Sequence, residues 1–466
     1  MKLPRACSYL CLVLAGSFPP ARAENALIDR LIAGDSGYKK DASEPAPRLD
    51  PKRIINASNG FLKEKEPEMT GEEYALYEKI STMAGSQPEF ALKLLEAMMN
   101  EKEPPSPAFE FILGNVYYSA GQVEKAEARY LSAVKRFPTF IRGWSNLGVL
   151  YYSADKYAEA SPCFSKAVTL GDHDPGTLGL LGYCLERTGN LVTAEMAYMQ
   201  ALAGNPDNAD WMEGLLRLFV QGKQYGRAEA LVRNLIKLRP AKRELWLAHA
   251  NILLAENRKR EAMVMLEASV GAGLAGSEAL NLLGDLYAEQ GLNTEAADIY
   301  QRLLAVTPVL GEQKLLSFAR VLIAAGRLAP AEDVLNRLQT DPASPAHLHF
   351  LQTKADLQAA RGQWPEARRT LQDLLQIAPL DGNALLGLGH AFAAEDDLPR
   401  AAFAFEAAFH LPAVQYRASL ELANLELKNR HYEKSAEYLQ KALSIENSDA
   451  VQDFLARVKT LIGRNE

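Results

Sequence analysis

Small residues recur along this chain in two columns with a period of 34 to 36 residues. The first column is Gly114, Gly148, Gly182, Leu216, Ala250, Gly284, Ala319, Ala355, Gly389 and Ala423. The second, twelve residues later, is Ala126, Ala160, Ala194, Ala228, Ala262, Ala296, Ala331, Ala367, Ala401 and Ser435. A minimal side chain lets two helix backbones approach to the short end of the 8–10 Å packing range. The columns therefore predict stacked helix pairs, which offer an extended surface for binding.

A column of large apolar side chains follows the first small column after sixteen residues. Its members are Tyr130, Phe164, Tyr198, Val232, Leu266, Tyr300, Leu335, Leu371, Phe405 and Leu439. Prolines such as Pro138 and Pro240 stand where a second helix must end. With these columns, and with the segment 432–443 (YEKSAEYLQKAL), about four fifths of the chain resembles the tetratricopeptide repeat (TPR) family. The expected fold is an all-α solenoid of stacked helix-turn-helix repeats. The resemblance implies a right-handed superhelix whose first helices line the concave side.

The first 23 residues are typical of a signal peptide. Lys2 and Arg5 precede an apolar run, and Ala21-Arg22-Ala23 forms a small-x-small cleavage site. The apolar run is too short to span a bilayer as a stop-transfer helix. We therefore expect export to the periplasm or the medium, with no transmembrane segment in the mature chain.

The rest of the chain divides by composition and period. Residues 24–70 are rich in charge, Pro, Ser and Gly and are expected to form a disordered tether. An imperfect helix pair over 71–103 precedes a block of about six repeats over 104–306 and a block of about four over 307–446. A capping helix is expected over 447–466. The enlarged turns at 307–312 and 340–346 are interpreted as loop insertions, with a hinge between the blocks as the alternative.

Charge and cysteine content exclude several classes of protein. The chain has 51 basic and 58 acidic residues, a net charge of −7, and no long basic run, so we expect no nucleic-acid partner. Only Cys163 and Cys184 remain after signal cleavage, on helices that pack together. Two buried thiols are the favoured interpretation. A single disulfide is the alternative, and it would need Cα atoms within about 7 Å.

No motif in the chain predicts catalysis, a cofactor or a metal. Residues 271–276 (GAGLAG) match the dinucleotide-binding glycine pattern, but they follow a predicted helix and lack the β-strand that the pattern requires. They are expected in a turn between repeats. The histidines are scattered, and no nucleophile–base set or paired-acid site stands out. We therefore expect a non-enzymatic protein without cofactor or metal.

The candidate partner-binding residues lie on the first helices, mostly one or four residues past the first small column. They are Asn115, Tyr118, Arg142, Tyr152, Tyr183, Arg217 and Asn251. Asparagine can bond peptide N–H and C=O together, and the tyrosines add aromatic contact area suited to an extended segment. The corresponding C-terminal positions include Ile323, Ala359 and Ala393, so we expect that half to contribute less.

Two functions fit this surface. The first is a protein–protein scaffold or adaptor in a bacterial cell envelope, binding extended segments or subunits of envelope complexes along the concave groove. The alternative is a binder or carrier of an exported polysaccharide or other polymer. Fold alone does not choose between them.

Overall fold

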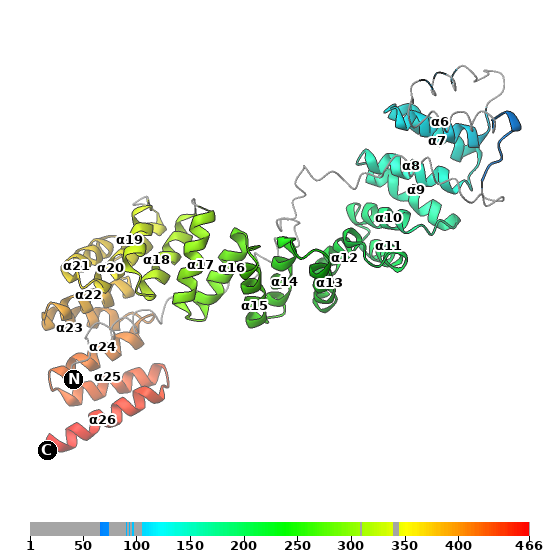
Figure 1. Ribbon diagram of the computed structural model, residues 1–466. Helices are drawn as coiled ribbons and strands as arrows, with labels where there is room; N and C mark the ends of the chain where they lie inside the picture. Colours follow the sequence, from blue (N-terminus) through cyan, green and yellow to red (C-terminus); the bar gives the residue numbers. More distant parts are fainter. Residues whose placement is uncertain are drawn as a thin grey trace. The chain divides into compact units, whose positions relative to one another are not determined.

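The computed structural model describes residues 66–73, 90, 93, 96, 105–307, 310–338 and 344–465. All regular structure within these ranges is helical, as expected for an all-α solenoid (Figure 1). The chain forms two compact units that divide between Leu274 and Ala275. The expected boundary at 306/307 lies inside the second unit. The predictions for residues 1–23, for residues 24–65 and for most of the helix pair at 71–103 lie outside the described residues.

The described part of the first unit holds five helix pairs, from α6 to α15. The pairs are α6 (Pro107–Ser119) with α7 (Val123–Arg136), α8 (Ile141–Ser153) with α9 (Tyr157–Leu170), α10 (Pro175–Arg187) with α11 (Leu191–Gly204), α12 (Ala209–Gln221) with α13 (Tyr225–Leu238), and α14 (Arg243–Ala255) with α15 (Lys259–Gly271). Some first helices are capped by side chains: Ser106 accepts a hydrogen bond from Phe109 N, and Asp174 accepts one from Thr177 N.

The second unit repeats this arrangement and ends in a single helix. Its elements are α16 (Ser277–Glu289) with α17 (Asn293–Val306), α18 (Glu312–Ala324) with α19 (Leu328–Asn336), α20 (Pro345–Ala360) with α21 (Trp364–Ile377), α22 (Gly382–Ala394) with α23 (Leu398–Phe409), α24 (Gln415–Lys428) with α25 (Tyr432–Ile445), and α26 (Asp449–Asn465). The last helix buries Val451, Leu455 and Val458 against Leu439 and Ala442 of α25. It therefore covers the apolar face that the last pair would otherwise expose.

The two small columns have different roles in the packing of each helix pair. A Cβ atom added to Gly182 would lie 2.8 Å from Cδ1 of Tyr198, and one added to Gly284 would lie 2.4 Å from Cε1 of Tyr300. The first column therefore makes room for the large side chain sixteen residues later, which lies on the second helix of the same pair. The second column is enclosed completely, because Ala126, Ala160 and the alanines equivalent to them in most repeats are 0% exposed.

Every repeat turns between its two helices through a residue with positive φ. This residue lies seven positions after the first small column in all ten described pairs. Glycine occupies five of these positions: Gly121, Gly189, Gly291, Gly326 and Gly362. The other five are Asp155, Lys223, Asn257, Asp396 and Arg430, with φ between 55° and 64°. A left-handed conformation costs a residue with a Cβ roughly 1–2 kcal/mol, and Asp and Asn somewhat less.

Three further expectations can be compared with the structure. Cys163 and Cys184 are buried free thiols, and burial raises the pKa of each to about 12. The glycine-rich residues 271–276 form the turn between α15 and α16, where Gly273 has a φ of +71° and no strand precedes it. Within the described ranges, no helix has both the length and the apolar character needed to cross a membrane.

Candidate functional site

Asn115 and Asn251 are buried rather than open for a partner. Asn115 on α6 is 8% exposed, and its Oδ1 accepts hydrogen bonds from Tyr130 Oη at 2.6 Å and Asn146 Nδ2 at 2.8 Å. Asn251 on α14 is 9% exposed, and its Oδ1 is buried without a hydrogen-bond partner among the described residues. Asn115, a candidate partner-binding residue, is therefore held inside the helix pair, because the hydroxyl of Tyr130 reaches it from the second helix.

We predict that Asn115→Ala lowers the free energy of unfolding by about 1–2 kcal/mol. The substitution leaves the hydroxyl of Tyr130, which is 1% exposed, without its acceptor. Asn424→Ala is the matched control, because Asn424 holds the same position on α24 but is half-buried. Urea unfolding of the two variants measures the difference. Equal midpoints would contradict a structural role for Asn115.

Two of the predicted tyrosines, Tyr152 and Tyr183, form an aromatic cluster with Tyr157 of α9. The ring of Tyr152 lies 5.6 Å from that of Tyr183 and 6.0 Å from that of Tyr157, and Tyr183 and Tyr157 are 5.5 Å apart, all edge to face. Tyr152 is only 5% exposed, so most of its ring is buried in the helix packing. Tyr183 is half-buried. Tyr118 is half-buried as well, and its hydroxyl lies 2.7 Å from Ser153 Oγ.

Both predicted arginines form bidentate ion pairs within the chain. Arg217 on α12 donates from Nε to Oε1 of Glu186 at 2.6 Å and from Nη2 to Oε2 at 2.9 Å. Glu186 also accepts a hydrogen bond from Tyr198 Oη at 2.8 Å. Arg142 on α8 donates to both carboxylate oxygens of Glu66, a residue expected within the disordered tether. Most polar groups of this predicted site are thus held by other side chains of the same chain.

A second group of polar side chains lies on the first helices of the second unit. We call Gln352, Asp356, His390, Arg417 and Glu421 the C-terminal polar cluster; they come from α20, α22 and α24. Gln352 Nε2 donates to Asp356 Oδ1 at 2.9 Å, and Arg417 Nη1 donates to Asn383 Oδ1 at 2.9 Å. His390 Nε2 lies 3.8 Å from Glu421 Oε1.

Burial shifts the ionisation of this cluster. It raises the pKa of Asp356 to about 6 and that of Glu421 to about 7, while Arg417 opposes both shifts. It lowers the pKa of His390 to about 4, with Arg417 and Lys428 adding to the effect. Near neutral pH, Glu421 can therefore donate a hydrogen bond as well as accept one. Gln352 Oε1 is buried with no hydrogen-bond partner in the described part of the chain. Such a set suits a ligand with hydroxyl or amide groups.

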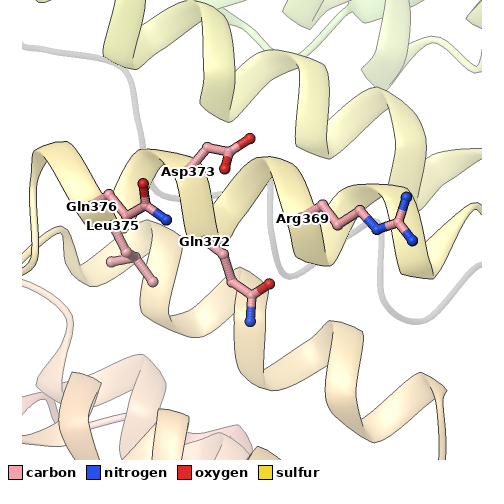
Figure 2. Close-up of a pocket in the computed structure, with 5 residues that line it drawn as sticks. All are labelled: Arg369, Gln372, Asp373, Leu375 and Gln376. Atoms are coloured by element: carbon pink, nitrogen blue, oxygen red, sulfur yellow. The ribbon is translucent and has the colours of Figure 1, made fainter.

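The second unit, which is expected from its sequence to contribute less to binding, also carries polar side chains on its first helices. Asp356 and His390 stand in the column one residue past the small column, but Glu421 and Arg417 stand two and six residues before it. Arg142 and Asn383 share that last column with Arg417, so the signal was present in the sequence. The depression in Figure 2 is a separate feature: Arg369, Gln372, Asp373, Leu375 and Gln376 line it, all from the second helix α21.

The tetratricopeptide repeat family matches the chain over residues 111–176, 145–209, 247–308, 353–410 and 416–449. These ranges cover repeats in both units. The chain belongs to the tetratricopeptide repeat family.

Relatives of this TPR chain come from bacteria and eukaryotes. It is 22% identical to the cellulose synthase operon protein C of Pseudomonas fluorescens (strain SBW25), over 80% of this chain and 34% of the relative. It is 24% identical to the cellulose synthase 1 operon protein C of Komagataeibacter xylinus, over 54% of this chain and 17% of the relative. The match thus spans about a third of these relatives or less. A solved structure of Naa15/Naa10 bound to HypK-THB aligns with a TM-score of 0.44 at 17% identity, covering 83% of this chain and 66% of that one.

Proposed function

We propose that this TPR chain is an exported, non-enzymatic scaffold that binds extended segments of other proteins along the concave side of its first helices. The observation that carries the proposal is the repetition of helix pairs within each of the two units, because family matches fall in both units and helical grooves of this kind take extended segments. The pattern of residues 1–23 supports export into a cell envelope, and the similarity to proteins of two bacterial species supports a bacterial setting.

The binding surface proposed for this function is the first-unit groove. Because Asn115, Tyr152 and Asn251 are buried, the half-buried Tyr118, Tyr183 and Arg217 are the sharper test set. Arg142 is left out of this set because Glu66 holds its guanidinium.

The test is a cross-linking pull-down from envelope fractions with three variants of the full chain. We expect Tyr118→Ala/Tyr183→Ala/Arg217→Ala to lower capture of a defined partner at least tenfold, as loss of several interface contacts of about 1 kcal/mol each requires. Lys166→Ala, at an exposed position on the second helix α9, is the control. Combined alanine substitution of Arg320, Asp356 and Arg417 in the second unit should lower the capture of the partner by less. If that second set alone releases the partner, the groove assignment is wrong.

A second candidate function is binding of an exported polysaccharide. The similarity to two cellulose synthase operon proteins favours it, and so does the C-terminal polar cluster, whose carboxyl, amide and guanidinium groups suit hydroxyl ligands. Calorimetry with cellohexaose tests this function. Binding that is lost in a combined Asp356→Ala/Arg417→Ala variant would support it, and absence of binding to the wild-type chain would contradict it.

A further inference from the structure

Residues 66–73 (blue in Figure 1) lie against the first two described repeats. The side chain of Glu66 is 9% exposed, Pro67 is buried, and Met69 packs against the core cluster that includes Phe109 and Leu113. Glu68 and Thr70, which flank Met69, are exposed. Pro67 and Met69 therefore face the repeats in the alternation of an extended segment, and the side chain of Glu66 is buried beside them.

The C-terminal end of this segment is fixed to the first repeat. Thr70 N donates to Glu73 Oε2 at 2.8 Å, and Glu73 N donates to Thr70 Oγ1 at 3.2 Å, which is a reciprocal capping box. The other carboxylate oxygen of Glu73 accepts a hydrogen bond from Ser106 N at 2.8 Å. Ser106 is the N-cap of α6, so Glu73 anchors the segment at the N-terminal end of that helix.

At its other end the segment meets Arg142 over an aromatic floor. The Arg142 guanidinium donates from Nε to Glu66 Oε1 at 2.5 Å and from Nη2 to Glu66 Oε2. Its carbon Cζ lies 5.7 Å from the ring centroid of Phe111, and Phe111 packs edge to face on Phe140 with centroids 4.9 Å apart. A planar guanidinium that stacks on an aromatic ring is pre-organised for two parallel bonds to a carboxylate.

We propose that Arg142, Phe111 and Phe140 form a receiving site for an internal acidic side chain followed by proline in an extended peptide. Glu66 of this chain occupies the site through its ion pair with Arg142, and the next residue, Pro67, is buried. A partner segment of the same chemistry must displace them. The inference rests on the proposed function, because it names the chemistry of the partner that the groove takes. A strap that only covered the end of the stack would need apolar contacts such as that of Met69, but no buried carboxylate held by both oxygens.

Binding of the chain's own segment in trans tests the receiving site. The probe is a fluorescent peptide with the sequence of residues 64–71 (EKEPEMTG), titrated by anisotropy into the full chain. In the wild type the tethered segment competes at an effective concentration on the order of mM, so the peptide should bind weakly. Glu66→Gln removes the carboxylate in cis, and the peptide should then bind about tenfold tighter or more. A peptide with Gln in place of Glu66 should bind the Glu66→Gln chain no more tightly than it binds the wild type.

Matched variants separate this effect from a general loosening of the segment. Glu68→Gln, two residues along and exposed, should behave as the wild type. The double variant Glu66→Gln/Arg142→Gln should lose the gain, and Glu66→Gln/Arg142→Lys should recover only part of it, because Lys lacks the planar fork. Circular dichroism of each variant checks the fold. The inference is overturned if Glu66→Gln binds the peptide no tighter than the wild type, or if loss of Arg142 leaves the gain intact.

The outcome for the receiving site is distinguishable from that for the scaffold. If the peptide shows no preference for Glu66→Gln while a partner is still captured through Tyr118, Tyr183 and Arg217, the inference is wrong and the proposed function stands. If the peptide binds as expected but no partner protein is captured by any variant, the receiving site stands and the scaffold function fails.

Discussion

Replacing Ala160 with Leu is expected to lower the free energy of unfolding by about 3 kcal/mol, the upper part of the range for overpacking a filled core. Ala160 on α9 is 0% exposed and faces the helix packing, so three added carbon atoms must push the helices apart. The measurement is chemical denaturation followed by circular dichroism.

The control for this prediction is Glu124→Leu. Glu124 lies in the first turn of α7 and is exposed, so the same new side chain meets solvent there. Its effect should stay within about 0.5 kcal/mol. Equal midpoints for the two variants would mean that the second small column is not the close-packing position.

Glu421→Gln is expected to stabilise the chain at pH 8 by about 2 kcal/mol and to have little effect at pH 5. Burial raises the pKa of Glu421 from 4.5 to about 7 in the folded chain. A carboxyl that holds its proton more tightly when folded contributes stability below pH 4.5 and loses it as pH rises to about 7. The neutral amide avoids this loss, because it never has to ionise in the buried site.

Neighbours of Glu421 also change the stability of the chain with pH. The raised pKa of Asp356 acts in the same sense, whereas the lowered pKa of His390 makes stability rise with pH between about 4 and 6.5. Urea unfolding of the wild type and of Glu421→Gln at pH 5 and pH 8 isolates the contribution of Glu421. Glu433→Gln, at an exposed position on α25, is the control. Equal differences at both pH values would contradict the shift assigned to Glu421.

The repeat fold could be predicted because it depends on contacts that recur at fixed spacings. The ring of Tyr198 occupies the space that a side chain at position 182 would fill. Phe164 is placed against Gly148, and Phe405 against Gly389, in the same way. A column of small residues and a column of rings sixteen residues apart record this packing directly in the sequence. The single helix α26 at the end follows from the same need to cover an apolar face.

Which polar side chains of the candidate site are hydrogen-bonded within the chain could not be predicted from one sequence column alone. A tyrosine in the ring column extends its hydroxyl to the polar face, so Tyr130 bonds Asn115, Tyr198 bonds Glu186 and Tyr300 bonds Asp285. Phenylalanine at the same place, as at Phe164, cannot. Whether a polar residue is open or held therefore depends on a second residue, which a reading of the first helices alone leaves out.

The contact between Glu66 and Arg142 could not be predicted from the repeat pattern. The two residues are 76 positions apart, and Glu66 belongs to no repeat. Composition alone marked its surroundings as a tether. The capping pattern Thr70-Gly71-Glu72-Glu73 was the available signal that structure begins at this point.

The inter-helix turns give this chain a reserve of stability that is independent of its binding faces. Five of the ten inter-helix turns between α6 and α25 hold a side chain in the left-handed conformation, among them Lys223 in the first unit and Arg430 in the second. Glycine adopts this conformation without the steric cost, and neighbouring repeats already use it there. Stepwise substitution of these residues by glycine could therefore raise the stability of one unit at a time without changing any side chain on the first helices.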